Sequence, residues 1–343
     1  MPRATEPYIV ASEPPRARRP GRSGLVGTGI RLAFGLGLLA VAMSPALAQR
    51  PSIPPQAIAG PALRVTPIEQ AQALELPAGL ALGQVASVAV DGRGHLYVLN
   101  RGDPALLEFD GNGRFVRGLA GGLFERAHGL TLDPAGGFWV TDVAAHVVMR
   151  LDADGRVTMT LGTRGQSGVW DETTGKHVFD EPNDVAIGPD GSVFVAQGHG
   201  RGEPMVLKFD SQGKFLKAWG GRGTLPWQFA VAHSILIHDG LLYVADRENR
   251  RISVFDLDGG FVKGWVYRGM ACSLALSGRH IFMTTGFDGQ IVELDLDGHV
   301  LGVTGKPGEG PNEYGEAHDI AVAGDAIYVA DVVNRRVQKL LMR

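Results

Sequence analysis

Residues 243–256 read YVADRENRRISVFD and contain the unit from which the chain is built. An apolar run ends in V-x-D, a few polar residues follow, and a second apolar run ends in F-D before a D-G turn. Alternating apolar residues on either side of tight turns indicate β-hairpins. Similar runs recur along the chain, and the first run of each copy begins at position 88, 130, 185, 235, 274 or 320.

The spacing of these copies predicts the fold. Successive copies begin 42, 55, 50, 39 and 46 residues apart, which leaves room for four short strands in each. Four strands every 40–50 residues or so are typical of a β-propeller blade. Six copies therefore predict an all-β, six-bladed β-propeller over residues 63–343.

The sixth copy is incomplete. It stops at the C-terminus after its third strand, whereas the segment ALRVTPI at residues 62–68 precedes the first copy. An unpaired outer edge would leave backbone amides without partners. We therefore expect this N-terminal strand to pair with the sixth copy and close the ring.

The N-terminal residues have the composition of a targeting segment. An arginine-rich leader precedes an apolar stretch at residues 32–46, and Ala46-Leu47-Ala48 fits an A-x-A cleavage signal. We expect a signal peptide over residues 1–48, a Pro- and Ala-rich linker over 49–62, and a secreted or periplasmic protein. The alternatives are a retained anchor or a true start further along the chain. No other apolar stretch reaches the ~20 residues needed to cross a bilayer, so we expect no membrane association after cleavage.

The composition further restricts the kinds of protein to which the chain can belong. The formal net charge of −3 argues against a nucleic-acid-binding surface. Cys272 is the single cysteine, so an exported chain of this kind must be held by its core, by ring closure or by metal. We expect a monomer that acts on a small-molecule or peptide substrate.

Three histidines occupy matched positions in alternate copies. Each opens a strand-like stretch two residues before the numbered start of the first run of its copy. They are His128, His233 and His318, separated by 105 and 85 residues. If the copies form a ring, the three imidazoles converge near its axis. Three neutral imidazoles with a fourth open position are a common zinc arrangement. A lone histidine at a strand start is usually a polar rim residue, but three in register favour a shared metal site.

The motifs also carry a family resemblance. Residues 243–256 are similar to the core of an NHL repeat, and residues 83–339 resemble the lyase domain of peptidylglycine α-amidating enzymes, the peptidyl-α-hydroxyglycine α-amidating lyases. The matching motifs are GQVASVAVD (83–91), NRGD (100–103), HGLTLD (128–133), FWVTDVAAH (138–146), HSI (233–235), ADREN (245–249) and HDI (318–320). This resemblance implies a six-bladed propeller that cleaves a peptidyl-α-hydroxyglycine to a peptide amide and glyoxylate.

The resemblance implies a set of site residues. In that family, histidines matching His128, His233 and His318 hold a catalytic zinc. A structural calcium is held there by backbone carbonyls matching Val88 and Leu130 and by a carboxylate matching Asp319. Arginines matching Arg101 and Arg247 lie in the active site, where a guanidinium can pair with a carboxylate of the substrate.

One motif departs from the family. The proposed base there is a tyrosine in a D-G-Y motif, whereas this chain reads Gln197-Gly198-His199. His199 is a candidate base because the ordinary pKa of an imidazole, about 6.5, lies near neutral pH. It is equally a candidate for a further metal ligand or a bystander.

Other readings of these residues stay open. Arg101 could simply pair with Asp103, and Arg247 lies in a turn common to NHL repeats. The whole chain could be a non-enzymatic propeller that binds a peptide, protein or glycan, because a fold alone does not fix function. A lactonase-type propeller with a calcium site remains a third reading through Asn183 and Asp184. Cys272 is expected in the core.

Three aspartates recur at the end of the second run of their copies. They are Asp142, Asp246 and Asp331. We expect them to accept hydrogen bonds from backbone amides, a structural role.

Overall fold

The computed structural model describes residues 56–69, 73–199 and 202–343. The expected signal peptide and residues 49–55 of the expected linker lie outside these ranges. The described residues belong to one compact unit. Within the described ranges, no helix is long and apolar enough to span a membrane.

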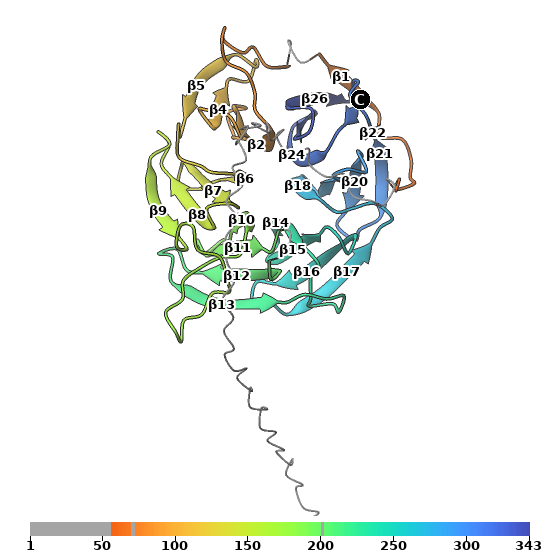
Figure 1. Cartoon of the computed structure of the whole chain (residues 1–343). Helices are drawn as coiled ribbons and strands as arrows, with labels where there is room; N and C mark the ends of the chain where they lie inside the picture. The colour runs from red at the N-terminus through yellow and green to blue at the C-terminus, as the bar shows by residue number, and fades with distance from the viewer. Residues whose placement is uncertain (1–55, 70–72, 200–201) are drawn as a thin grey trace, which may run out of the picture. The chain divides into compact units, whose positions relative to one another are not determined.

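The described strands form six four-stranded antiparallel sheets that are arranged as the blades of a ring (Figure 1). Blades one and two comprise β2 (Val85–Val90), β3 (Leu96–Asn100), β4 (Leu106–Phe109) and β5 (Phe115–Leu119), then β6 (Ala127–Leu132), β7 (Phe138–Asp142), β8 (Val147–Leu151) and β9 (Val157–Leu161). Blades three and four comprise β10 (Pro182–Ile187), β11 (Val193–Gln197), β12 (Met205–Phe209) and β13 (Phe215–Gly220), then β14 (Ala232–His238), β15 (Leu241–Asp246), β16 (Arg251–Asp256) and β17 (Phe261–Val266). Blade five comprises β18 (Ser273–Ser277), β19 (His280–Thr284), β20 (Ile291–Asp295) and β21 (Val300–Thr304), and β22 (Lys306–Pro307) and β23 (Glu313–Tyr314) form a short parallel pair after it. The six-bladed all-β fold is thereby confirmed.

Blade six is closed by the N-terminal strand, as expected. Its order is β1 (Val65–Ile68), β26 (Arg336–Met342), β25 (Ala326–Asp331) and β24 (Ala317–Ala323). Val65 lies opposite Met342, and both side chains pack on the blade-six core. The two ends of the propeller therefore share one sheet, which leaves β26 with a partner on each side.

The described part of the expected linker lies along blade five. The backbone N–H of Ile58 donates to Gln290 Oε1 at 2.7 Å, and the Ile58 side chain is buried among apolar residues of blades four and five. The N–H of Val303 donates to the carbonyl of Pro61 at 2.8 Å. These residues consequently help to hold the strand that closes the ring.

The apolar core lies between neighbouring blades. Trp139 of blade two, for example, packs with Val185, Val195 and Leu207 of blade three. Because each inner strand is covered by a blade on either face, strands such as β3 are buried along their whole length. The first strands of the blades are thereby held around the axis, where they position the site.

The recurring aspartates bond to the loop that precedes the first strand of their own blade, as expected for a structural role. Asp142, Asp246 and Asp331 accept backbone hydrogen bonds from the N–H groups of Arg126, Val231 and Glu316, at 3.0, 3.2 and 3.1 Å. Each donor lies two residues before one of the three histidines. The aspartates thus fix the approach of the chain to the histidine positions.

Candidate metal centre

The first strands of the six blades line a central cavity of about 340 Å³. Five of these strands carry a β-bulge where they approach the histidine positions. The bulges fall at Ala86 in β2, His128–Gly129 in β6, Asn183 in β10, His233 in β14 and His318 in β24. A bulge redirects a side chain and interrupts the strict alternation of a strand. These bulges thus place one residue of each of the five blades at a similar height along the axis of the ring.

The three matched histidines meet in this layer. The ring centroids of His128 and His233 are 4.9 Å apart, those of His128 and His318 are 4.7 Å apart, and those of His233 and His318 are 5.0 Å apart. All three side chains are buried and line the cavity. Alternate blades of the closed ring bring together residues that are 105 and 85 positions apart in the sequence.

Each of the three imidazoles is oriented by the backbone of another blade. The Nδ1 atoms of His128, His233 and His318 lie 2.9, 2.9 and 2.7 Å from the carbonyl oxygens of Asn183, Cys272 and Ala86. A carbonyl only accepts, so Nδ1 carries the hydrogen and Nε2 keeps a lone pair. Among the described residues, no hydrogen-bond partner reaches the buried Nε2 of His128 or His233. Buried nitrogens with free lone pairs and fixed tautomers fit the donor set of a metal ion.

Burial also keeps these imidazoles neutral. It lowers the pKa of His128 and of His233 well below the usual range, and neighbouring histidine and arginine charges add to the effect. Burial, with the charges of Arg101 and Arg247, lowers the pKa of His318 to about 3. Neutral imidazole is the form that ligates metals, so the site needs no deprotonation at pH 7.

A fourth imidazole joins the group. The ring centroid of His199 lies 5.0 Å from that of His128 and 5.7 Å from that of His233. One ligand nitrogen from each of these three residues lies within 4.8 Å of the others. This histidine group could hold a metal ion.

Two arginines lie near the histidine layer. Arg101 donates from Nε to the carbonyl of Ala127 at 3.1 Å and from Nη1 to Gln84 Oε1 at 3.1 Å. Its pKa falls to about 10, mainly through burial. Its hydrogen bonds thus run to these two groups, whereas Asp103 accepts from the N–H of Gly122 at 3.0 Å.

Arg247 is paired within its own turn. It donates from Nε to Glu248 Oε1 at 2.9 Å, and its side chain is only 12% exposed. Burial lowers the pKa of Arg247, but Glu248, Cys272 and Glu316 together raise it above its usual value. The side chain is therefore charged and largely shielded from solvent.

The sequence prediction missed two further charged residues. Glu316 is buried, and burial raises the pKa of its carboxyl group although Arg247 and Arg101 oppose the shift. The exposed Arg126 also acts electrostatically on Arg101 and His199. Glu316 and Arg126 each lie two residues before a matched histidine, and that fixed spacing is the signal that could have found them.

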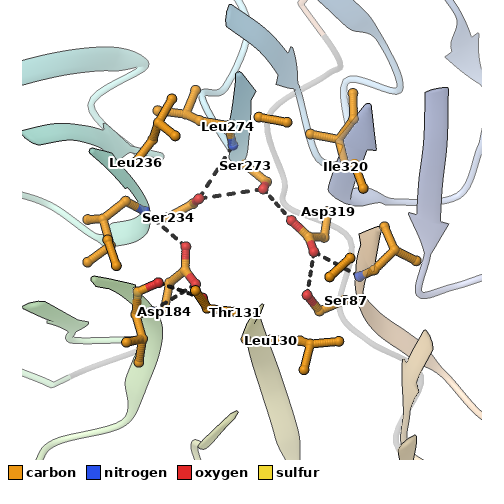
Figure 2. A pocket seen from close by; sticks show the side chains of 18 of the residues that line it. Ser87, Leu130, Thr131, Asp184, Ser234, Leu236, Ser273, Leu274, Asp319 and Ile320 are labelled. Atoms are coloured by element: carbon orange, nitrogen blue, oxygen red, sulfur yellow. Dashed lines mark hydrogen bonds between the residues drawn. The ribbon is translucent and has the colours of Figure 1, made fainter. Parts of the chain in front are cut away.

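Serine and aspartate side chains form a polar layer in the cavity (Figure 2), and the matched histidines line the same cavity. Asp319 accepts hydrogen bonds from the hydroxyls of Ser87 and Ser273 and, at 3.0 Å, from the N–H of Val88. Val88 and Leu130, the other two expected calcium ligands, line the same cavity. All three expected calcium ligands thus line the central cavity.

Asp184 adds a second carboxylate to this layer, and like Asp319 it is half-buried (Figure 2). It accepts from the N–H groups of Val185 at 2.8 Å and Ile235 at 3.0 Å. Burial raises its pKa to about 7, and the charge of Asp319 contributes to the shift. Two carboxylates without a cation between them are therefore unfavourable here, which fits a hard divalent ion such as calcium.

No family model matches the chain. Among curated proteins, it is 35% identical over 225 residues to the peptidyl-glycine alpha-amidating monooxygenase of Mus musculus, a match that covers 54% of this chain and 22% of that protein. It is 32% identical over 202 residues to a probable peptidyl-alpha-hydroxyglycine alpha-amidating lyase of Caenorhabditis elegans, covering 51% of this chain and 56% of that one. It is 32% identical over 197 residues to NHL repeat-containing protein 3 of Homo sapiens, covering 52% and 53%. The chain thus spans between about a fifth and somewhat more than half of the length of these relatives.

Solved structures agree on the fold. Virginiamycin B lyase from Staphylococcus aureus has a TM-score of 0.56 at 12% identity, covering 82% of this chain and 99% of that one. A gluconolactonase from Xanthomonas campestris has the same TM-score at 17% identity, covering 86% and 99%. Proteins with such different names share this architecture, so the likeness shows the fold alone. Taken with the relatives, the chain is an all-β, six-bladed NHL-type propeller that resembles the peptidyl-α-hydroxyglycine α-amidating lyases.

Proposed function

We propose that this protein is a metal-dependent lyase that cleaves the carbon–nitrogen bond of an α-hydroxy-amide, such as a peptidyl-α-hydroxyglycine, to an amide and glyoxylate. The observation that carries the proposal is the layer of three buried imidazoles, each with Nδ1 bonded to a carbonyl of another blade. The lyase names of relatives at 30–32% identity support the reaction class.

The donor set favours zinc in the histidine layer. Imidazole nitrogens suit this borderline-soft ion, and three of them leave a position for substrate. Zinc held by His128, His233 and His318 would act as a Lewis acid toward the substrate hydroxyl. In the polar layer, we propose a structural calcium held by Asp319 and the carbonyls of Val88 and Leu130, because hard oxygen donors suit that ion.

The charged residues around this layer supply the remaining chemistry. The guanidinium groups of Arg101 and Arg247 would bind the substrate carboxylate and hold it beside the histidines. A base then removes the proton of the α-hydroxyl, its electrons form the new carbonyl of glyoxylate, and the carbon–nitrogen bond breaks toward nitrogen, which takes up a proton. His199 and Glu316 are the two candidates for the base.

We also propose that residues 1–48 direct export and that the mature protein meets its substrate outside the cytoplasm as a monomer. A peptide or a small α-hydroxy-amide would enter from the side on which the arginines lie. A non-enzymatic binding propeller is the second candidate, because a similarly matched relative is named only for its NHL repeats.

Metal analysis combined with a product assay tests the proposal. The purified protein, residues 49–343, should contain about one zinc per chain and release glyoxylate from α-hydroxyhippurate. His233→Ala should lose both properties. His299→Ala, which changes a side chain that is 75% exposed in an outer turn, should keep both. Full activity in a metal-stripped sample would exclude a metal-dependent lyase, and absence of both zinc and glyoxylate would favour the binding propeller.

A further inference from the structure

His199 lies at the end of β11 on a turn that is tied to blade three. Gly198 has a φ of +103°, and a Cβ there would approach the Cα of Pro204 to 2.4 Å, so the position requires glycine. The N–H of Gly198 donates to the carbonyls of Asp180 and Glu181 at 3.0 and 3.1 Å, and the N–H of His199 donates to that of Glu181 at 3.4 Å. The segment before β10 therefore determines where His199 points.

That direction is toward the histidine layer. The His199 side chain is only 21% exposed, and its ring stands edge-on to the ring of His128 with an interplanar angle of 70°. A ligand nitrogen of His199 lies within 4.8 Å of those of His128 and His233. Ligands of one tetrahedral zinc are about 3.4 Å apart, given Zn–N bonds of about 2.0–2.1 Å. The nitrogens of these three residues would therefore have to move closer together when they bind one ion.

Glu181 is placed to orient this fourth imidazole. Its Oε2 is buried, accepts no hydrogen bond from any described residue, and lies 3.9 Å from His199 Nδ1. Its backbone has a φ of +55°, and its N–H donates to Nδ1 of His146 at 3.2 Å. Six other non-glycine residues of the described ranges share this left-handed conformation, so the placement of Glu181 beside His199 rests on its contacts.

Each of the four imidazoles would then use one ring nitrogen to donate a hydrogen bond to the protein and the other to bind the ion. His128, His233 and His318 use Nδ1 to bond a backbone carbonyl, which leaves Nε2 for the ion. A carboxylate is the other usual acceptor for the second nitrogen of a metal-bound histidine. We propose that His199 binds the same metal ion as a fourth imidazole ligand and that Glu181 positions it by accepting the hydrogen of Nδ1. This inference rests on the metal site of the proposed function. It also implies that His199 closes the site at rest and yields its place to substrate, because a catalytic zinc needs an open position.

The test measures metal binding and coordination without a substrate. Zinc affinity is determined by competition with a chromophoric chelator, and the cobalt(II)-substituted protein, residues 49–343, is examined by visible absorption. His199→Ala should weaken zinc binding at least about tenfold and lower the cobalt band intensity, because a water replaces an imidazole. Glu181→Gln should weaken zinc binding by about 10–100-fold, the usual effect of losing a partner that orients a ligand.

His177→Ala is the matched control. His177 is an exposed histidine that precedes the same segment, with a side chain that is 49% exposed, and its replacement should change neither readout. The melting temperature of each metal-free variant shows whether the variant has folded. A His199→Ala protein that is folded and matches the unmodified protein in zinc affinity and cobalt spectrum would overturn the inference. If His233→Ala loses zinc in the same experiment, the proposal of a metal site at the three matched histidines still stands. An unmodified protein that binds neither metal would overturn both.

Discussion

At the scale of single residues, these histidines differ from ordinary buried ones in the partners of their second ring nitrogen, Nε2. A structural imidazole in a core normally bonds through both nitrogens or leaves one in contact with water. Here three Nδ1 atoms are satisfied by carbonyls, and the Nε2 atoms of His128 and His233 meet no partner among the described residues. The cost of two buried, unpaired acceptors is of the order of 1–3 kcal/mol each, and a bound cation would remove it.

The three matched histidines could be predicted from sequence because they recur at one position of a repeat. Glu181 could not be assigned in this way, because its position beside His199 arises from turns at the two ends of a hairpin in blade three. Glu316 is marked in the sequence only by its spacing of two residues from His318, and its electrostatic interactions arise across blades. Glu181 approaches His199 through a loop, and Glu316 is influenced by Arg101 and Arg247 from blades one and four. The roles of Arg101, His199 and Arg247 stay predictions, although the structure places each of them near the histidine layer.

The half-buried carboxylate of Asp184 gives a prediction about how stability depends on pH. Burial raises the pKa of Asp184 to about 7, whereas an aspartate in the unfolded chain titrates near 3.9. Between these values the folded metal-free protein holds more protons than the unfolded chain, so this residue makes stability fall as pH rises from about 4 to about 7. Compared with Asp184→Asn, the unmodified protein should lose up to about 1.4 kcal/mol of unfolding free energy per pH unit in that window.

Urea unfolding at pH 5, 6 and 7 in a chelator measures this difference. Asp258→Asn changes an aspartate whose side chain is 83% exposed and, among the described residues, pairs only with the ammonium group of Lys208, so it should show the same pH dependence as the unmodified protein. If the unfolding free energies of the unmodified protein and of Asp184→Asn change equally with pH, the Asp184 carboxylate is not titrating in this range. Calcium in excess should flatten the dependence, because a bound cation favours the charged carboxylate.

At the scale of elements, the bulges of the first strands explain where the sequence prediction and the structure differ. The apolar alternation placed the starts of the first runs at positions such as 130 and 320, whereas β6 and β24 begin at 127 and 317. The register shifts at the histidines, so the strict period of two is interrupted there. A pattern search that counts alternating residues stops at this interruption, although the strand continues through it.

The bulge of β6 depends on a glycine. A Cβ at Gly129 would lie 2.4 Å from the carbonyl oxygen of Asn183, and that oxygen also accepts the hydrogen of His128 Nδ1. Gly129→Ala must therefore displace the group that orients His128. We expect a loss of about 1–3 kcal/mol in unfolding free energy, as for an overpacked core, together with weaker zinc binding.

Gly92→Ala is the matched control for this substitution. An added Cβ at Gly92 meets no heavy atom of the described residues within 4 Å, so its stability and zinc affinity should match those of the unmodified protein. Urea unfolding and chelator competition provide the two measurements. Unchanged zinc affinity in Gly129→Ala would mean that the Asn183 carbonyl does not determine how His128 binds.

At the scale of the whole molecule, closure of the ring brings residues that are far apart in the sequence into one site. Ligand candidates on β6, β14 and β24 come from blades two, four and six, and no two of these blades are adjacent. Their rings meet only if all six blades keep their places around the axis. The sequence could predict this convergence because ring closure follows from six copies, one of them incomplete.

Closure itself depends on the N-terminal residues of the propeller. β1 pairs with β26 from Val65 to Ile68, and the preceding residues anchor that strand on blade five through Ile58 and Gln290. Burial of Ile58 alone should contribute about 2–5 kcal/mol, judged from the cost of truncating buried isoleucines. Deletion of residues 49–68 should therefore lower the melting temperature by at least about 5 °C.

The same deletion should act on the metal site at a distance. It exposes the edge of β26, and unpaired edges promote association between chains, so size-exclusion chromatography should reveal oligomers. Blade six would no longer be tied to the start of the chain, and His318 on β24 would lose its fixed position beside Ala86, whose carbonyl lies 2.7 Å from its Nδ1. Zinc affinity should fall with it, whereas deletion of residues 49–55 alone leaves β1 and Ile58 in place and should change neither property. A protein without residues 49–68 that melts and binds zinc like the longer one would mean that five complete blades and three strands of the sixth already hold the histidines together.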